Sequence, residues 1–548
     1  MSNALLAGVS GLQAHQTMLD VAGNNLANVD TYGFKSSRTT FGELLSQTMR
    51  EATQPTTNGG GTNPQQVGAG VKVASIDRNM GQGNLVFTGQ PLDMAIEGSG
   101  YFALSDGQKD VYTRVGAFAV DADFCLVNPS SGFRVQRIGS EGVAEGFQNA
   151  SSNDIRIPYD VALPAKATES VTFTGNLSAD SGTTPTTSLI SSGMQYTEAG
   201  GVASRDSLLF GLDQASGLAP GDTIGITGTT AAGTAVNSTL TLGAGTTVND
   251  LLDAITTAFP GSVASLSNGE IRLTDSTAGY SQTDLNLAYT SSAGTGTFTL
   301  PSYFKILQAG GEDVRDTNVE VYDSQGVGHV LSVAFARTKT PNTWDAVLSS
   351  MTGDGYMDDR RVKGITFGSD GSYGGITGTD EPVFRLRFGF SVTSVQDVQL
   401  KLGNPGQFDG LSQFGGPSTV AASGQDGYEA GYLASLSVSR DGTLVGMFTN
   451  GVRQNVAALK LATFQNPAAL ESLGGGMFTA SANSGDPLPT KAQSGGAGSV
   501  NGGSLEKSNV DMASEFVSLI QAQNGYQANA RTIRVTNDML QELASLIK

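Results

Sequence analysis

The sequence contains very little cysteine and very little histidine. Cys125 is the one cysteine among 548 residues, so no disulfide can form within the chain. His15 and His329 are the two histidines, and with one cysteine they supply too few ligands for an ordinary His/Cys zinc site. We therefore predict no metal, no cofactor and a fold that stands without disulfides.

Positive charge and long apolar runs are also scarce. The chain has 31 Lys and Arg against 50 Asp and Glu, a formal net charge of −19, which argues against a nucleic-acid partner because phosphate binding needs a basic face. No stretch approaches the roughly 18 apolar residues that a membrane-spanning helix requires. The N-terminus lacks the basic and apolar regions of a Sec signal. We expect no membrane insertion, and export, if it occurs, without a Sec signal.

Residues that could carry chemistry are scattered. Residues 98–103 fit G-x-G-x-x-A, but they precede a predicted strand rather than a helix, so a phosphate cradle is not expected. Asp121 and Asp123 resemble the start of a calcium loop, but position 12 of that loop is Gly132 instead of Glu. Neither histidine has credible partners for a nucleophilic triad. We predict that the protein is not an enzyme.

Two further polar features have simple structural interpretations. Cys125 stands between Phe124 and Leu126, which is typical of a small packed residue rather than a reactive thiol. The charge run 358–361 (Asp-Asp-Arg-Arg) is typical of a solvated loop.

Glycine is the residue that this chain has in excess. Its 73 glycines, with abundant Ser and Thr and 7% aromatic residues, indicate a turn-rich, mostly β fold. Short alternating runs separated by glycine begin at Val71 and predict strands, and residues 248–255 predict an isolated helix. The length allows about three or four domains. The predicted fold class is α+β and multidomain.

Shifts in composition divide the chain into nested parts. We predict a terminal helical core (1–30 plus 505–548), linker segments (31–70 plus 481–504), a first β domain (71–171 plus 406–480), a second β domain (172–182 plus 306–405) and an inserted outermost domain (183–305).

Apolar residues recur at seven-residue steps at both ends of the chain. The C-terminal series is Leu505, Met512, Leu519, Tyr526, Ile533, Leu540 and Ile547, and the N-terminal series is Leu5, Leu12, Leu19 and Leu26. A seven-residue step is typical of a coiled-coil seam, so we expect the two ends to meet in an α-helical coiled-coil core. The alternative is a pair of amphipathic helices lying on a domain core.

Several segments resemble the bacterial flagellar rod and hook proteins. Residues 11–35, including Gly23-Asn24-Asn25-Leu26-Ala27-Asn28, are similar to the N-terminal signature of that family. Residues 88–102 with 112–118 resemble its central motif, and residues 505–540 resemble its closing helix. Together these motifs cover about a third of the chain.

Length and further segments favour the hook members of the family over the shorter rod members. Residues 410–414 with 424–431 resemble the hook members' return into their second-layer domain, and residues 321–326 are similar to their outer β domain. The chain departs from the family in residues 183–305, which exceed the compact members, and at Cys125, where glycine would be usual.

The resemblance implies a structural subunit of the flagellar hook. Such subunits polymerise with copies of themselves into a bendable helical tube, a universal joint that transmits torque from rod to filament. It implies rod, hook-cap and hook-filament junction proteins and the flagellar export apparatus as partners, and an extracellular place at the hook. The expected subunit-interface residues are Leu5, Leu12, Leu19, Asn24, Asn25, Leu26, Asn28, Leu505, Met512, Phe516, Leu519, Gln523, Tyr526, Ile533, Leu540 and Ile547.

Two other functions remain open at this point. One is a distal rod protein with a large insertion, and the other is a secreted, β-rich adhesin or binding module.

Overall fold

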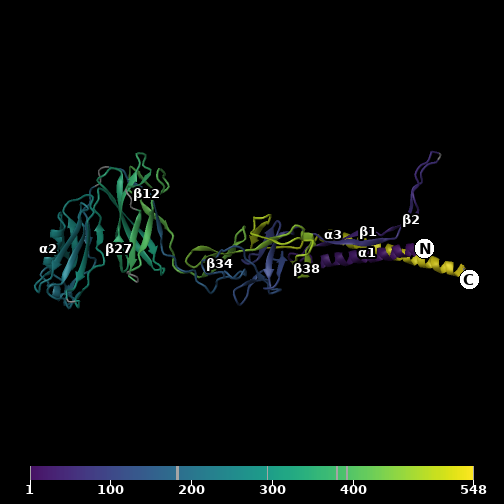
Figure 1. The fold of residues 1–548 in the computed structure, drawn as a ribbon, viewed down its shortest axis with the longest axis horizontal. Coiled ribbons are helices and arrows are strands. Elements are labelled where there is room, and N and C mark those ends of the chain that lie inside the picture. The colour runs from purple at the N-terminus through teal and green to yellow at the C-terminus, as the bar shows by residue number, and fades with distance from the viewer. Residues whose placement is uncertain are drawn as a thin grey trace. The chain divides into compact units, whose positions relative to one another are not determined.

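The computed structural model describes residues 2–57, 59–180, 184–292, 294–377, 381–389 and 393–546. The chain divides into two compact units. Unit 1 comprises residues 1–163 and 431–548, and unit 2 comprises residues 164–430. The fold is mostly β, with one helix near each end of the chain and a third helix in unit 2 (Figure 1).

Three α-helices occur among the described residues. Helices α1 (Ser2–Ala27) and α3 (Met512–Leu546) belong to unit 1. Helix α2 (Val248–Ala258) begins with a capping box, because the Thr247 side chain accepts from the Asp250 amide and the Asp250 side chain accepts from the Thr247 amide. This confirms the helix predicted over 248–255.

The strands of unit 1 form one large sheet and several small ones. The large sheet has the order β38-β39-β8-β7-β11-β10-β9, with β37 pairing β7 and β40: β7 (Tyr101–Ser105), β8 (Asp110–Thr113), β9 (Ala119–Val120), β10 (Leu126–Val127), β11 (Arg134–Val135), β37 (Leu461–Thr463), β38 (Glu471–Gly474), β39 (Met477–Thr479) and β40 (Leu488–Thr490). The small sheets are β1 (Ser37–Glu43) with β4 (Val71–Arg78), β2 (Ser46–Arg50) with β3 (Gln65–Gly68), β5 (Leu85–Phe87) with β42 (Ser504–Glu506), β6 (Met94–Glu97) with β41 (Ser499–Gly502), and β34 (Leu433–Val438) with β35 (Thr443–Phe448) and β36 (Arg453–Ala458).

Unit 2 contains two larger sheets and several smaller ones. The larger ones are β27 (Gly355–Asp359)-β30 (Val383–Phe388)-β31 (Gln396–Lys401)-β12 (Ser170–Ser178)-β32 (Leu411–Phe414), with β33 (Ala421–Gln425) on β12, and β24 (Val314–Tyr322)-β25 (Gly328–Arg337)-β26 (Thr343–Met351)-β28 (Arg361–Phe367)-β29 (Tyr373–Ile376). The others are β19 (Ser262–Ser267)-β20 (Glu270–Asp275)-β13 (Leu189–Ser191)-β23 (Lys305–Gln308), β18 (Ala235–Thr241)-β17 (Thr223–Thr229)-β21 (Asp284–Thr290), β14 (Thr197–Glu198)-β15 (Gly201–Val202) and β16 (Ala215–Ser216)-β22 (Thr297–Phe298).

The described residues of unit 2 form two apolar cores. One surrounds Trp344 and Phe335 between the two larger sheets. The other surrounds Ile255 of α2 and also takes in Ala334 and Val347 from β25 and β26. Most of the side chains of this second core come from residues 183–305, and the sheet that follows them in sequence extends it with Ala334 and Val347.

The structure corrects two predicted boundaries. Residues 411–425, which we assigned to the first β domain, belong to unit 2 because β32 pairs in parallel with β12, with Gly175 opposite Leu411. The segments predicted to be loose linkers, 31–70 and 481–504, contain strands whose backbone groups are paired with neighbouring strands.

The predicted start of the C-terminal helix at Leu505 is wrong. Leu505 lies in strand β42, opposite Val86 of β5, and is buried. Helix α3 begins at Met512, and the side chain of Asp511 accepts a hydrogen bond from the Ala513 amide at 3.0 Å, which is the geometry of an N-cap. The heptad pattern alone would start the helix at Leu505, but the N-cap at Asp511 sets its start at Met512.

The charge run 358–361 is not a solvated loop. Asp358 and Asp359 end strand β27, and Arg361 begins β28. Arg360 between them is buried, and its guanidinium donates to the backbone oxygens of Phe304 and Leu348. Saturated hydrogen bonding makes burial of this charge possible.

The turn at Cys125 has ordinary geometry for that residue. The left-handed backbone conformation falls on Phe124, with φ 62°, and Cys125 itself is buried. Burial raises the pKa of the Cys125 thiol, as expected for a packed side chain.

Candidate functional site

The two terminal helices pack against each other in antiparallel directions (Figure 1). Near the start of α1, a Cβ atom built on Gly8 would lie 2.9 Å from Cγ1 of Ile533. Near its end, Nδ2 of Asn25 donates to Oε1 of Glu515 at 3.0 Å. As the residue number rises along α1 it falls along α3, so the ends of the chain are paired along most of α1.

Glycine sets the distance between these helices. A Cβ on Gly11 would lie 2.6 Å from Oδ1 of Asn529, and a Cβ on Gly525 would lie 2.5 Å from the ring of His15. The imidazole of His15 also packs edge-on against Phe41 of β1. Because real Cβ contacts are longer than these distances, the seam is occupied by side chains from one helix opposite glycines of the other.

The predicted heptad residues do not form the centre of this seam. On α1 the buried positions are Gly8, Gly11, Ala14, Ala22 and Asn25, whereas Leu5, Leu12 and Leu26 are half-buried and Leu19 is exposed. The larger leucines lie beside a stripe of small residues that allows the close approach. The heptad seam therefore stays a prediction, and the buried positions of α1 differ from the predicted leucines.

The predicted residues of α3 divide in the same way. Leu519 and Ile533 are half-buried, and Met512, Phe516, Gln523, Tyr526 and Leu540 are exposed. Ile547 lies outside the described residues. The structure therefore brings Ile533 to the seam, opposite Gly8, leaves Leu519 half-buried and leaves the other described residues of this set on the surface.

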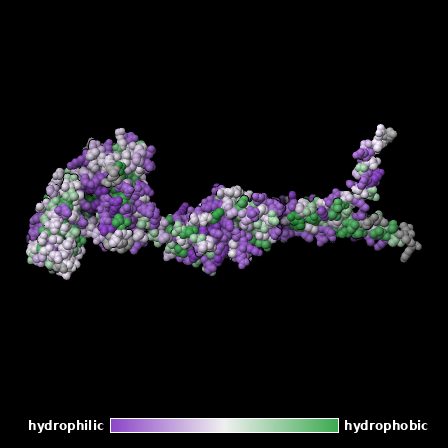
Figure 2. Space-filling view, in the orientation of Figure 1, coloured by the Kyte–Doolittle hydropathy of each residue, from purple (hydrophilic) through white to green (hydrophobic). Residues whose placement is uncertain are grey.

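Large apolar side chains cover the outer faces of both helices. Exposed fractions reach 58% at Leu6 and 57% at Ile520. The full set on α1 and α3 is Leu6, Val9, Leu19, Met512, Phe516, Val517, Ile520, Tyr526, Val535, Met539, Leu540 and Leu543. Figure 2 shows the hydrophobic colour concentrated along this helical part of unit 1. Contiguous exposed apolar surface of this kind marks a site of protein association.

The three predicted asparagines at the end of α1 and just after it have different roles. Asn25 is buried and joins α1 to β1, because its Nδ2 donates to the Ser37 carbonyl at 2.6 Å and its Oδ1 accepts from the Ser37 amide at 2.9 Å. Asn28 donates to Oδ1 of Asn24 at 3.2 Å, in a local turn at the end of the helix. Asn25 therefore positions the helix, and Asn24 stays exposed.

Protonation of Glu515 is expected to make the stability of the α1–α3 pair depend on pH. Its partial burial raises the pKa of the carboxyl group, and the charge of Asp511 acts in the same direction, although the hydrogen bond from Asn25 opposes them. A raised folded-state pKa favours the paired helices most when Glu515 is protonated, and this contribution is lost as pH rises through the folded pKa. We expect helix-pair stability to increase between pH 7 and pH 4, measured by circular dichroism at 222 nm during thermal unfolding. Glu515→Gln should flatten this dependence, and an unchanged pH profile in Glu515→Gln would disprove the assignment.

A buried ionic cluster lies next to the helix pair, and we did not predict it from the sequence. Nζ of Lys35 lies 2.7 Å from Oε1 of Glu506, and Nη1 of Arg114 lies 3.5 Å from Oε2. The Gly83 amide donates to the same carboxylate at 2.8 Å. Burial lowers the pKa of Lys35, and the charge of Glu506 opposes that shift. The cluster ties together the segment after α1, strand β8 and strand β42.

The one sequence signal near this cluster is that two of its residues lie in segments that resemble the family. Lys35 ends one of the segments that resemble the family and Glu506 lies at the start of another, but neither position shows that its charge is buried. Opposite charges 471 residues apart do not produce a local pattern.

Comparison with known families places matches along most of the chain. Residues 5–35 match the family "Flagella basal body rod protein", and residues 501–546 match "Flagellar basal body rod FlgEFG protein C-terminal". Residues 95–179 match "Flagellar hook protein FlgE/F/G D1 domain", and residues 289–428 match "Flagellar basal body protein FlaE D2 domain".

Full-length relatives decide between these related families. The flagellar hook protein FlgE of Borreliella burgdorferi is 30% identical, and the alignment covers all of both chains. The chain belongs to the flagellar hook protein family. FlgE of Treponema pallidum is also 30% identical over the whole of both chains, and FlgE of Escherichia coli is 26% identical over 99% of this chain and all of that one.

Membership of the flagellar hook protein family confirms the resemblance seen in the sequence. This membership supports a role for the protein as a structural subunit located at the flagellar hook. The flagellar hook proteins are not an enzyme family. A solved Helicobacter pylori hook protein, FlgE2, aligns over 76% of this chain and 99% of its own, with 16% identity and a TM-score of 0.39. That score is too low to transfer its arrangement of domains.

Two further observations concern the described residues alone. No helix there is long and apolar enough to cross a membrane. No group of three or more His, Cys, Asp or Glu side chains there could hold a metal ion.

Proposed function

We propose that this hook-family subunit polymerises head to tail with copies of itself into a bendable helical tube. The observation that carries the proposal is the exposed apolar surface of α1 and α3. Burying apolar surface contributes about 25 cal/mol per Å², so covering these side chains with equivalent helices of neighbouring copies would favour association. A head-to-tail contact that does not close generates an open helical assembly.

The terminal helices would form the inner, coiled-coil core of that tube. The seam between α1 and α3 positions both helices within one subunit, and the leucines beside it would pack against neighbouring subunits. We assign the subunit interface to the predicted residues that lie on or beside the helix surfaces, including Leu5, Leu12, Leu19 and Phe516. Gln523 and Asn24 would supply uncharged hydrogen-bonding groups at the edges.

The β2–β3 hairpin offers a second surface for neighbouring copies. Every residue of both strands is exposed, and Leu45 beside it is 92% exposed. An isolated two-stranded hairpin is marginally stable in water, so contact with another subunit would stabilise it.

The rest of the proposal follows from the division of the chain into nested units. Unit 2 leaves and rejoins unit 1 at residues 163–164 and 430–431, so the β domains could shift as the tube bends while the helical core persists. Such a tube would act as a universal joint that transmits torque from rod to filament. The partners would be rod, hook-cap and hook-filament junction proteins, and the export apparatus would deliver the subunit outside the cell without a Sec signal.

Charge placed on the exposed helix face tests this function. Phe516 is 52% exposed, so Phe516→Asp should leave the subunit folded and abolish tubes seen by electron microscopy, because a charge in a packed interface costs several kcal/mol. Phe516→Leu keeps the apolar surface and should form tubes. Normal tubes from Phe516→Asp would contradict the interface.

The same images distinguish the alternatives. Curved, bendable tubes support the hook, straight tubes would indicate a distal rod protein, and a persistent monomer in the wild type would indicate a binding module.

A further inference from the structure

A polar cavity in unit 2 lies where residues 183–305 meet the sheet that contains β28. Its volume is about 330 Å³, and its walls include Thr229 at the end of β17, Gln282, Asp284 at the start of β21, and Arg361 and Lys363 of β28. A volume of this size is at the lower end of the range for small-ligand sites. The cavity is lined by separate strands of one compact unit, so its shape is fixed by their packing.

The carboxylates around this cavity already have cationic partners. Asp284 accepts from Nη1 of Arg360 at 3.0 Å, and Asp358 is paired with Arg387. Asp359 lies 3.8 Å from Arg385. These acidic groups therefore do not neutralise the remaining cations of the cavity.

The two cations at one corner of the cavity differ in the partners that they already have. Arg361 forms an ion pair with Asp345 at 3.5 Å, and its guanidinium lies over the ring of Tyr280, but its buried Nη1 makes no hydrogen bond. That carboxylate is already engaged, because it accepts from the Tyr280 hydroxyl and the Gly364 amide. Lys363 has no ion pair within the described part of the chain.

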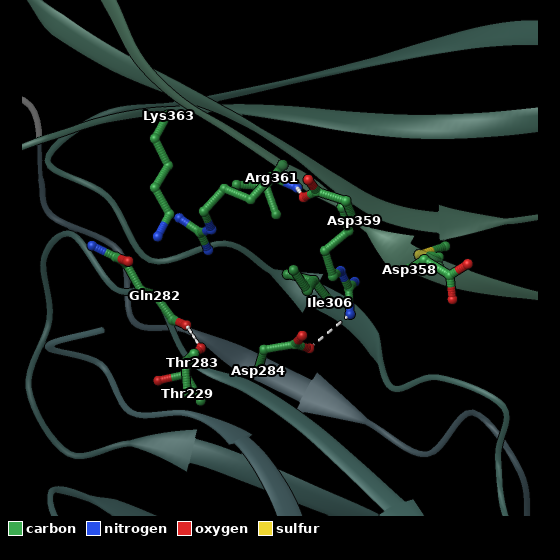
Figure 3. Close-up of a pocket in the computed structure, with 12 residues that line it drawn as sticks. Thr229, Gln282, Thr283, Asp284, Ile306, Asp358, Asp359, Arg361 and Lys363 are labelled. Atoms are coloured by element: carbon green, nitrogen blue, oxygen red, sulfur yellow. Dashed lines mark hydrogen bonds and ion pairs between the residues drawn. The ribbon is translucent and has the colours of Figure 1, made fainter. Parts of the chain in front are cut away.

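These donors converge on one corner of the cavity. Figure 3 shows the ends of Arg361 and Lys363 side by side, with the side-chain amide of Gln282 across the opening and its oxygen nearer to them than its nitrogen. A 180° rotation of this amide would turn its N–H toward the corner. Arg361 and Lys363 stand two residues apart on β28, so both side chains project from the same face of the strand. A planar guanidinium, an ammonium group and an amide N–H together match the oxygens of a tetrahedral anion.

We propose that this corner binds a small inorganic oxyanion, phosphate or sulfate. Arg361 and Lys363 provide charge-assisted hydrogen bonds, and Gln282 provides a neutral donor from the opposite wall. The bound anion neutralises the repulsion between neighbouring cations and bridges β28 to the Gln282–Asp284 segment. This site is independent of subunit assembly, because all of its donors belong to unit 2 of one chain.

Trp344 provides the readout for the test. It is the one tryptophan of the chain, and it is fully buried in unit 2, so its fluorescence reports the unfolding of that unit. The full-length subunit is titrated with sodium phosphate, sodium sulfate, sodium acetate and sodium chloride at matched ionic strength. Phosphate and sulfate should raise the unfolding midpoint in a saturable manner, and chloride and acetate should not.

Matched variants locate the site. Lys363 is exposed, so Lys363→Gln should fold normally and weaken phosphate binding about tenfold, as expected for loss of a charge-assisted hydrogen bond. Gln282→Glu places a negative charge opposite Arg361 and should also weaken it. Lys401→Gln removes an exposed lysine of β31 away from the cavity and should have no effect.

Three results would overturn the proposal. One is equal stabilisation by chloride and phosphate, which would show general screening of charge. Another is stabilisation by acetate alone, which would show a site for carboxylates. The third is equal phosphate affinity in Lys363→Gln and the wild type.

Discussion

Replacing Glu506 with alanine is expected to destabilise unit 1 by about 3–5 kcal/mol, because it leaves Lys35 and Arg114 buried without their counter-charge. The loss is larger than that of a surface ion pair, since all three side chains have almost no exposure to solvent. The Gly83 amide also loses its acceptor. We expect faster hydrogen exchange in β5 and β42, the two strands that meet at this cluster.

The adjacent residue and the second unit provide controls for Glu506→Ala. Lys507 is exposed, so Lys507→Ala should change stability little. Trp344 fluorescence should show the same unfolding midpoint for unit 2 in both variants. Replacing Lys35 with methionine in the Glu506→Ala background should recover part of the lost stability, because it removes one of the two unpaired charges. Wild-type exchange rates in Glu506→Ala would contradict the role of the cluster.

Replacing Gly11 with leucine is expected to separate α1 from α3. A Cβ at this position already lies 2.6 Å from Asn529, so a longer side chain cannot fit without moving one helix away from the other. Overpacking of this kind costs about 1–3 kcal/mol. We expect increased hydrogen exchange along both helices and loss of assembled tubes.

Gly23 is the matched control on the same helix. No atom lies within 4 Å of a Cβ built there, so Gly23→Leu has the same gain in helix propensity without the steric conflict. Gly23→Leu should retain or increase protection of α1 and should preserve the contacts with α3. Equal exchange in the two variants would show that the helices are not held by this close packing.

The strongest predictions from the sequence concerned elements with a local signal. The helix over 248–255 and the two terminal helices have clear periodicity, and the structure contains all of them. Family resemblance was carried by contiguous motifs, which the comparisons confirm.

Features that depend on tertiary contacts were missed or misplaced. The leucines of α1 have a strong apolar pattern, but the closest approach to α3 is at the glycines Gly8 and Gly11, whose role depends on the distance to a second helix. Arg360 resembled a surface residue because its acceptors, including the carbonyl of Phe304, come from distant strands. The return of β32 to β12 likewise joins segments that are far apart in the sequence.

The buried cluster of Lys35, Arg114 and Glu506 also has a consequence for the order of folding. Lys35 and Glu506 are separated by 471 residues, so their contact closes one of the longest loops available to the chain. Contacts between distant residues form late, since the entropy of loop closure must be overcome first. The N-terminal segment cannot complete this contact until the C-terminal strand is present. In a chain that still lacks strand β42, Lys35 would therefore have no Glu506 to pair with, and the segment after α1 would not be held in place. The contact that joins the two ends of the chain forms only when both segments are present.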